Sequence, residues 1–450
     1  MDEMNMFTEN YETLLNDGCY TRLRCSLLDD NPANVAEFIE ELEPTKMLFV
    51  FRLLSKDMAA AVFSYMDSDS RGHIIKSITD NEIRNIVNQM FMDDTIDFLG
   101  ELPANLVTKV LKNTDENKRK LINKFLQYPE DSAGSLMTIE FVELHKSMSV
   151  KSATEHIVKT GVNKETIYTC YVVDEEKILI GVLPLRALIV SDDEKLVGEL
   201  MEDHVISVKT LDDQEMVADV FKKYSLIAMP VVDNENRLVG IITVDDIVGV
   251  IEEENTEDFE KMAALIPAED EYMKTSVITL TKNRVVWLLV LMISGTLSSA
   301  IILKYSAVLS SVAILASFIP TLMNTGGNAG SQSSTLIIRG MALGEISTRD
   351  IMKVIFKEAR IGIVAGTVLA AVNFLRLALF VHTDVKVNLT ISASMLFTVI
   401  ISKVIGGMLP IAAKKLRFDP AVMAAPIITT IVDALSLIIF FNFAEFFILK

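Results

Sequence analysis

The feature that most constrains this chain is the run Val285–Leu303, which holds 19 residues without a charge. A helix of that length is long enough to cross the hydrocarbon core of a bilayer. More apolar stretches follow it to residue 450, whereas no apolar run before residue 285 approaches membrane length. We therefore expect residues 277–450 to form a transmembrane domain and the preceding residues to fold in water.

Charge divides the chain at the same place. Residues 1–284 carry 54 acidic and 29 basic residues, a net charge of −25, whereas residues 285–450 carry 7 and 13, a net charge of +6. Nucleic acid is disfavoured as a partner of the acidic part, because phosphate binding needs basic patches. An acidic surface suits cations, although it can also serve solubility alone. The N-terminus lacks a secretory signal pattern, so we expect the acidic part to stay in the cytoplasm.

The beginning of the acidic part is expected to be helical. Residues 33–131 contain apolar positions three and four apart, as in Ala33–Leu42, Lys56–Tyr65, Asp80–Met90 and Asp93–Leu99. A weak similarity between successive turns predicts a superhelix of helix pairs. Residues 1–32 precede this helical N-domain as an extension.

Residues 132–250 contain an internal repeat. Tyr171-Val-Val-Asp174 is followed, seven residues after its Asp, by Gly181, and Pro230-Val-Val-Asp233 is followed at the same spacing by Gly240. Each half predicts a strand, a turn, a second strand and the start of a helix, which is an α/β pattern. The repeat resembles a tandem pair of CBS domains, with the halves at 132–198 and 199–250.

Two further features frame this repeat. A Leu-Met pair precedes each half, at Leu136-Met137 and Leu200-Met201. Residues 251–276 begin with Ile-Glu-Glu-Glu and predict a long acidic helix that connects the CBS pair to the transmembrane domain.

Five membrane spans are expected. They cover Val285–Leu303, Ala307–Met323, Ile361–Val381, Leu389–Ala413 and Ala421–Leu449. The connections after the second and fourth spans hold clusters of Lys and Arg, whereas the other two hold one Lys each. The positive-inside rule then places the N-terminus in the cytoplasm and the C-terminus outside.

Asp433 lies inside the fifth span, with Thr429 and Thr430 on nearly the same helix face. A carboxylate at membrane depth costs roughly 2.5–3.5 kcal/mol, so it needs a partner or a water-filled path. Hard divalent cations prefer oxygen ligands, and Mg²⁺ keeps several waters while meeting one or two carboxylates. A hydrated Mg²⁺ ion on a water-filled path would suit Asp433. The alternative is a structural ion pair with Lys403 or Arg376.

A segment rich in small residues, 320–334, stands between the second and third spans. Its Gly326, Gly327 and Gly330 allow tight turns and close backbone approach. Irregular backbone at membrane depth is tolerated where it is buried in protein or lines water. Asn328 and Gln332 offer neutral oxygen ligands near a pore. Close packing of helices through small residues is the other interpretation.

The Gly-Gly-Asn-Ala-Gly-Ser-Gln stretch, the Arg339-Gly340 pair, the Asp419-Pro420-Ala421 turn and Asp433 resemble the MgtE family of magnesium channels. The order of helical N-domain, CBS pair, acidic helix and five-span domain is also similar. The resemblance implies a homodimer in the cytoplasmic membrane, with a Mg²⁺ pore on its two-fold axis that closes when Mg²⁺ binds the cytosolic part. The acidic residues that match the family's sensor positions are Asp93, Asp97, Asp213, Glu215, Asp246, Glu254, Glu257 and Asp258.

The sequence also departs from the family pattern. Gly249 and Ser225 stand where further sensor carboxylates are expected, and Ala425 stands where the family can place an Asn near the pore. Lys403 inside the fourth span is unusual and can extend its ammonium toward the cytosolic surface. Sensor affinity and ion selectivity can therefore differ from those of the family.

Other functions stay open at this stage. A transporter for Co²⁺ or for divalent cations in general is consistent with the residues, because selectivity among such ions is geometric. A membrane-anchored sensor would bind ATP or a related nucleotide in the CBS cleft, although one span would suffice as an anchor. An anion channel is disfavoured by Asp433. No catalytic dyad, phosphate loop or paired catalytic carboxylates indicate an enzyme.

Overall fold

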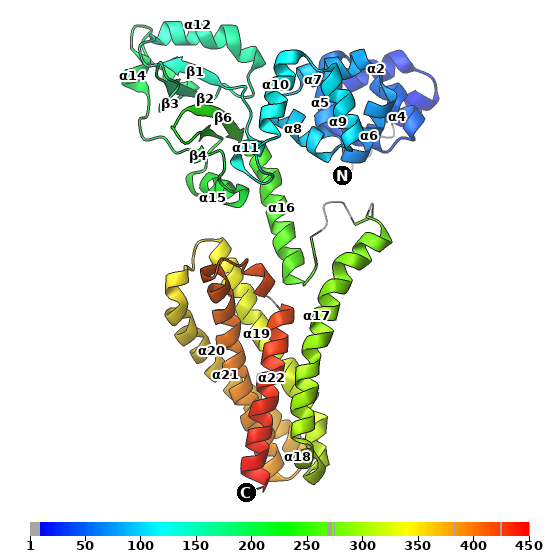
Figure 1. The fold of residues 1–450 in the computed structure, drawn as a ribbon, viewed down its shortest axis with the longest axis vertical. Helices are drawn as coiled ribbons and strands as arrows, with labels where there is room; N and C mark the ends of the chain where they lie inside the picture. The colour runs from blue at the N-terminus through cyan, green and yellow to red at the C-terminus, as the bar shows by residue number, and fades with distance from the viewer. Residues whose placement is uncertain (1–9, 268–271, 274, 382, 424, 450) are drawn as a thin grey trace. The chain divides into compact units, whose positions relative to one another are not determined.

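The computed structural model describes residues 10–267, 272–273, 275–381, 383–423 and 425–449. The chain forms two compact units, residues 1–252 and residues 253–450 (Figure 1). The division falls inside the helix that follows the second CBS half.

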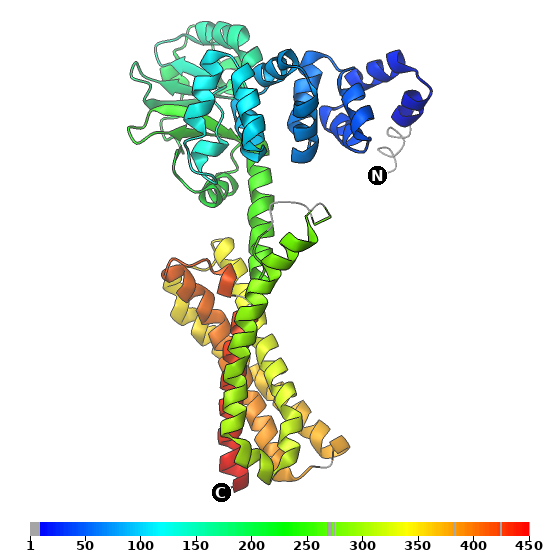
Figure 2. The ribbon, with the colours of Figure 1, turned by 45° about the vertical axis from the view of Figure 1, so that its right-hand side comes forward.

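The first unit begins with short helices that build a superhelix (Figure 2). They are α2 (Tyr20–Asp29), α3 (Pro32–Glu40), α4 (Pro44–Phe51), α5 (Lys56–Tyr65), α6 (Ser68–Ser77), α7 (Asp80–Gln89), α8 (Met92–Glu101), α9 (Ala104–Asn113) and α10 (Glu116–Phe125). Each helix packs on the one two places further along, as α3 does on α5, α5 on α7 and α7 on α9. The predicted helical N-domain is confirmed, and it already includes α2, whose Leu23 and Leu27 are buried in the common core.

Two small sheets of identical topology follow the helices. The first contains β1 (Val142–His145), β2 (Thr169–Val173) and β3 (Leu179–Pro184), and the second contains β4 (Val208–Lys209), β5 (Ala228–Val232) and β6 (Leu238–Thr243). In each, the first two strands are parallel and the last two are antiparallel. Helices α12 (Val150–Thr160) and α15 (Gln214–Tyr224) connect the parallel strands. The internal repeat is therefore a repeat of structure.

The short segment that precedes each sheet packs against the other sheet. A Cβ atom added to Gly240 would lie 2.7 Å from Sδ of Met137, and one added to Gly181 would lie 2.6 Å from Sδ of Met201. A backbone bridge between Thr138 and Ile241 holds the first of these segments against the second sheet. Glycine stands at both positions because the methionine and the backbone behind it leave no room for a side chain. The two halves therefore exchange segments, a feature that a boundary between residues 198 and 199 does not express.

The connecting helix α16 (Val244–Met262) starts inside the second CBS half. It ends well before residue 276, the end expected from the sequence. Ala264, just beyond it, has a left-handed φ of 54°, and Pro267 follows. Both features stop a helix.

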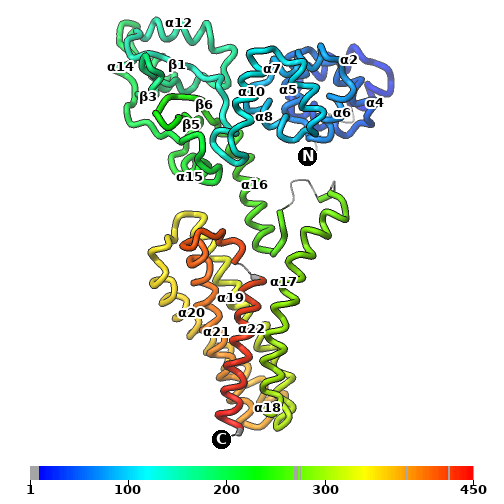
Figure 3. Tube along the Cα trace, viewed as in Figure 1, coloured from blue at the N-terminus to red at the C-terminus, as the bar shows by residue number. Residues whose placement is uncertain are grey.

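The second unit consists mainly of long helices (Figure 3). They are α17 (Val277–Lys304), α19 (Ile319–Ala342), α20 (Ile351–Arg376), α21 (Val385–Lys415) and α22 (Ala425–Ala444). Within the described residues, four helical stretches are long and apolar enough to cross a membrane: Val277–Lys304, Thr348–Val381, Val385–Lys415 and Ala421–Ile448. These agree with four of the five expected spans.

The second expected span, Ala307–Met323, is not one helix. It is divided into α18 (Ser306–Ser311), a 3₁₀ turn at Ala313–Phe318 and the start of α19. Pro320 stands in the first turn of α19 and favours a helix start there. Helix α19 therefore runs through the glycine-rich segment, and the irregular backbone that we considered for this segment is corrected to a regular helix.

Helix α19 packs through its glycines. A Cβ atom added to Gly330 would lie 2.7 Å from Cγ2 of Ile428 on α22, and one added to Gly326 would lie 2.7 Å from Cγ2 of Thr398 on α21. The closest approach is at Gly406 on α21, where an added Cβ would lie 2.1 Å from the carbonyl oxygen of Gly330. Small residues let helix backbones approach closely in a membrane, so close helix packing is the interpretation that holds.

We expect Gly406→Ala to destabilise the second unit. The new methyl group would meet backbone, which cannot move aside as a flexible side chain can, so the loss belongs at the upper end of the roughly 1–3 kcal/mol typical of overpacking. The midpoint of thermal unfolding in detergent measures it. Gly295→Ala on α17 is the control, because no atom lies within 4 Å of an added Cβ there. Equal midpoints for the two variants would contradict the packing argument.

Candidate metal centres

One acidic cluster lies in the first unit, where α8 approaches the first turn of α16. Helix α8 contributes Asp93, Asp94 and Asp97, and α16 contributes Asp245 and Asp246. Asp93 is buried, with 6% of its surface exposed. Negatively charged side chains at helix N-termini are stabilised by the helix dipole, which explains in part why so many acids collect here.

The carboxylates of this cluster are buried and repel one another. Burial, followed by the charge of Asp246, raises the pKa of Asp97 to about 7. Burial raises the pKa of Asp246 to about 6, against a hydrogen bond of 2.7 Å from the Thr243 hydroxyl that lowers it. Burial and then Asp246 also hold the pKa of Asp93 well above its ordinary value. A divalent cation would relieve this repulsion, because it bridges carboxylates.

Glu165, in the loop before β2, belongs to the same cluster. Burial and the charges of Asp245, Asp94 and Asp246 raise its pKa to about 8. Its Oε2 atom is buried and has no hydrogen-bond partner in the part of the chain that the structure describes. A buried oxygen without a partner costs free energy that a bound cation would recover. No pattern in the sequence indicates that Glu165 belongs to this cluster, because it is an isolated acid in a loop.

Two basic residues border the cluster. Lys118 donates from Nζ to the carbonyl oxygens of Val87 at 2.5 Å and Met90 at 2.6 Å. Burial lowers its pKa, whereas Glu140, Asp93 and Asp94 raise it. Arg71 is engaged by Glu101, at 2.5 Å between Nη2 and Oε2. These bases therefore compensate the cluster only in part.

The remaining sensor candidates lie elsewhere. Asp213 caps α15, where its Oδ1 accepts a hydrogen bond of 3.0 Å from the amide of Glu215. Glu254, Glu257 and Asp258 lie on the last turns of α16, in the second unit. The structure brings Asp93, Asp97 and Asp246 together, and it adds Asp94, Asp245 and Glu165, which were not predicted.

The acids at the end of α16 have a basic partner. Nζ of Lys261 lies 2.7 Å from Oε1 of Glu257 and 2.7 Å from Oδ2 of Asp419. Burial and then the charge of Asp419 raise the pKa of Asp258. Asp419 thus completes this group, although the sequence indicated only a turn there, which its hydrogen bond of 2.8 Å from the Ala421 amide confirms.

None of these groups is a preformed metal site. Among the described side chains, no three His, Cys, Asp or Glu residues are close enough together to hold a metal ion. An ion would therefore have to draw the carboxylates together, which fits a site that changes shape when it fills.

Asp433 on α22 forms neither a hydrogen bond nor an ion pair with any described residue, and it is half-buried. The hydroxyls of Thr429 and Thr430 donate to the carbonyl of Pro426 at 2.9 and 3.0 Å, so their lone pairs remain available as ligands. Lys403 and Arg376 have other partners. The structural pair that we considered for Asp433 is therefore not formed.

Helix α19 turns a polar face outward beside α22. Asn324, Asn328 and Gln332 are exposed at intervals of four residues, and Nδ2 of Asn328 donates to Oδ1 of Asn324 at 3.1 Å. On the packed side, Gly327 contacts Thr429, at 2.9 Å from an added Cβ to Cγ2. A polar helix face within the membrane needs water or a second polar surface against it. The side chain of Ala425 lies outside the described residues.

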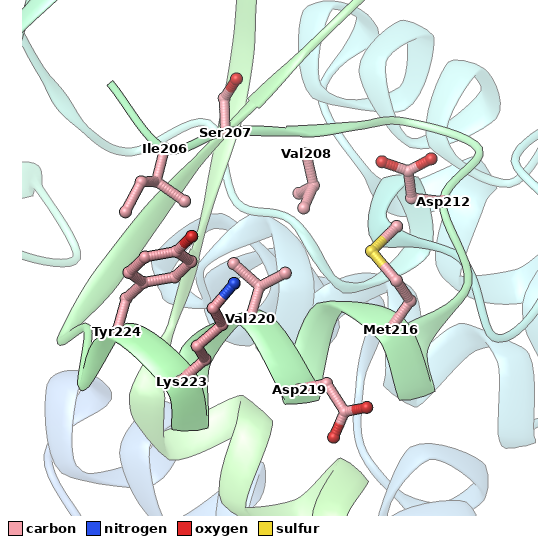
Figure 4. Close-up of a pocket in the computed structure, with 9 residues that line it drawn as sticks. All are labelled: Ile206, Ser207, Val208, Asp212, Met216, Asp219, Val220, Lys223 and Tyr224. Atoms are coloured by element: carbon pink, nitrogen blue, oxygen red, sulfur yellow. The ribbon is translucent and has the colours of Figure 1, made fainter. Parts of the chain in front are cut away.

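A pocket of about 340 Å³ lies between the start of β4 and α15 in the second CBS half (Figure 4). Lys223 points toward its middle, beside the Tyr224 ring, whereas the carboxylate of Asp219 points away. Asp212 lies at its edge. One directed ammonium and one ring suit a phosphorylated aromatic ligand, and Asp212 counts against the phosphates.

We expect Mg²⁺ to bind the α8 cluster about tenfold more tightly at pH 8 than at pH 6, because protons on groups with pKa values of about 6 to 7 must leave first. These values lie above the ordinary 3.8, so the folded state loses stability as pH rises through them, and Mg²⁺ offsets that loss. Titration calorimetry of the full chain measures the affinity, and thermal unfolding with and without Mg²⁺ measures the stability. Asp97→Asn should flatten the pH dependence, and exposed Asp193→Asn should not; equal behaviour would refute the assignment.

Comparisons with known proteins cover nearly the whole chain. The MgtE family, described as divalent cation transporters, matches residues 319–443, the MgtE intracellular N domain matches residues 30–131, and the CBS domain matches residues 197–253. The magnesium transporter MgtE of Thermus thermophilus is 34% identical over 436 residues, which are 96% of this chain and 96% of that protein. The magnesium transporter MgtE of Bacillus subtilis is 33% identical over 445 residues, with 96% and 98% covered.

A solved structure supports the arrangement of the first unit. The crystal structure of the cytosolic domain of the Mg²⁺ channel MgtE in complex with ATP matches with a TM-score of 0.52 and 34% identity. The match covers 54% of this chain and 99% of that one.

Proposed function

The chain belongs to the MgtE family of magnesium transporters, and we propose that it is a Mg²⁺-selective channel that closes when Mg²⁺ binds its own cytosolic part. The observation that carries the proposal is that carboxylates lack full compensation by bases in two places, a cluster in the first unit and Asp433 on an apolar helix of the second unit. The relatives are named as transporters, and we propose no enzymatic activity.

Conduction is assigned to Asp433 and the polar face of α19. Asp433 has no partner among the described residues, and Thr429 retains oxygen lone pairs beside it. Asn328 is assigned a position near the pore. The exposed polar face of α19 supports a homodimer, because a second copy across a two-fold axis would enclose water between two such faces. Two carboxylates on that axis suit a hydrated Mg²⁺ ion.

Gating is assigned to Asp93, Asp97 and Asp246, with Glu165 as an additional ligand. Without Mg²⁺ the negative charges favour separation of α8 from α16, and with Mg²⁺ they are bridged. A ligand that binds one arrangement more tightly shifts the population toward it. Glu254, Glu257 and Asp258 on α16, and Asp213 and Glu215 on α15, are proposed to add further Mg²⁺ contacts.

The proposed topology is multi-pass in the cytoplasmic membrane, with the N-terminus in the cytoplasm and the C-terminus outside. Basic residues support it through the positive-inside rule, because they gather in and beside the connections that follow α19 and α21: Arg339, Arg349, Lys353, Lys357, Arg360, Lys414, Lys415 and Arg417. ATP is proposed as a ligand of the CBS pair, supported by the neighbour solved with ATP and by Lys223 in the pocket of the second half. Loss of ATP binding in Lys223→Met, measured by calorimetry, would locate it there.

The first test is Mg²⁺ influx into liposomes that contain the purified chain and a lumenal Mg²⁺ dye. We expect Asp433→Asn to lower flux at least about tenfold, since a contact with a charged group contributes about 1.5–3 kcal/mol. Glu445→Gln, an exposed carboxylate at the end of the same helix segment, is the control. Unchanged flux in Asp433→Asn would place the ion path elsewhere. Flux of Co²⁺ but not of Mg²⁺ would establish the alternative function of a Co²⁺ transporter. Equal flux of both ions would establish a transporter of divalent cations in general.

The gate is tested in the same liposomes by adding Mg²⁺ on the cytosolic side. Wild-type flux should fall as the α8 cluster fills, whereas Asp97→Asn and Asp246→Asn should stay open at Mg²⁺ concentrations that close the wild type. Asp193→Asn should close normally. If both cluster variants close at the wild-type concentration, Mg²⁺ acts at another site or not as a gate.

A further inference from the structure

Two charged side chains are buried between helices of the second unit, and neither has a role in the function proposed above. Glu358 on α20 is 6% exposed and Lys403 on α21 is 8% exposed. Both lie within stretches that are apolar and long enough to span a membrane. A buried ion pair is often no more stable than well-packed apolar residues of the same volume, so packing alone does not explain these charges.

A serine connects the two charges. Ser333 of α19 donates its hydroxyl to Oε2 of Glu358 at 2.6 Å, and its Oγ accepts from Nζ of Lys403 at 3.5 Å. The same ammonium donates to Oε1 of Gln332 at 3.4 Å. The order is therefore ammonium, hydroxyl, carboxylate across three helices. Gly407 makes room for it, since a Cβ added there would lie 3.0 Å from Cγ of Glu358.

This network has a direction. Gln332, which Lys403 reaches, belongs to the exposed polar face of α19 with Asn324 and Asn328. Both charges contact the buried Ser333, but among the described residues Gln332 bonds to Lys403 and not to Glu358. The positive end thus faces the polar surface, and the negative end lies behind it.

We propose that Lys403 is a fixed positive charge behind the ion path, neutralised in part by Glu358 through Ser333, and that this pair sets how tightly a divalent cation is held beside α19. The inference rests on the proposed function, because it requires the polar face of α19 to line the path. A conducting site must bind its ion well enough to admit it and weakly enough to release it. A lysine behind the polar face of α19 repels the cation and weakens its binding. A glutamate that partly neutralises the lysine reduces this repulsion.

The test measures the external Mg²⁺ concentration for half-maximal influx in liposomes, with chelator on the cytosolic side. Lys403→Met removes the positive charge and should lower this concentration at least about threefold. Glu358→Gln removes the carboxylate that neutralises Lys403, so the positive charge acts more strongly on the ion and should raise the concentration by a similar factor. The double variant Glu358→Gln with Lys403→Met should lie between them. Lys357→Met, which removes an exposed base beside Glu358, should leave the value unchanged.

Opposite shifts in the two single variants are the decisive result, because a merely structural pair would lower maximal flux in both and shift neither concentration. Shifts of the same sign, or none, overturn the proposal. If a charge variant fails to fold, Ser333→Ala keeps both charges and breaks their link, and it should raise the half-maximal concentration; no shift in that variant overturns the proposal. Absence of Mg²⁺ flux in the wild type would instead refute the proposed function itself.

Discussion

The second unit depends on the approach of the α19 backbone to α21. Gly330 and Gly406 meet where neither can carry a side chain, and this contact fixes how α19 is rotated about its axis. That rotation turns Asn324, Asn328 and Gln332 outward and Ser333 inward. The polar face, the contact with α22 beside Asp433 and the buried charge network therefore follow from one packing constraint.

The chain treats its carboxylates in two ways. Glu257 and Asp419 meet Lys261, and Glu358 is joined to Lys403 through a hydroxyl. The carboxylates of α8 and the start of α16 are compensated only in part, and Asp433 has no described partner. A basic partner offsets the charge of a carboxylate, whereas carboxylates without one keep a mutual repulsion that a bound cation would relieve. The main ion sites are proposed at the second kind.

Much of this could be predicted from the sequence, and the limits have physical causes. The helical periodicity of apolar residues predicts the N-domain helices, and the internal repeat predicts both CBS halves. Both patterns are local in the sequence, so they can be recognised without the tertiary structure. The second span was misplaced because glycine and asparagine lower hydropathy, although in α19 they serve packing and a polar surface. The sequence predicts Asp93, Asp97 and Asp246 as acids of one site, and the structure places them together, whereas Glu165 joins them only through tertiary contact. The predicted boundary at 198–199 does not reflect that each half places a segment, at Met137 or Met201, against the sheet of the other half. No local sequence pattern indicates this exchange of segments.

That exchange also bears on how the two CBS halves unfold. Each sheet is closed by a segment that enters from the other side of the repeat, so neither can open without breaking the contact that seals its neighbour. The two halves are therefore interlocked, and we expect them to unfold in one transition rather than two. A displacement of β6 would shift Met137, which precedes the first sheet by five residues, and would therefore reach β1 through the backbone. Two similar modules thereby act as a single mechanical body.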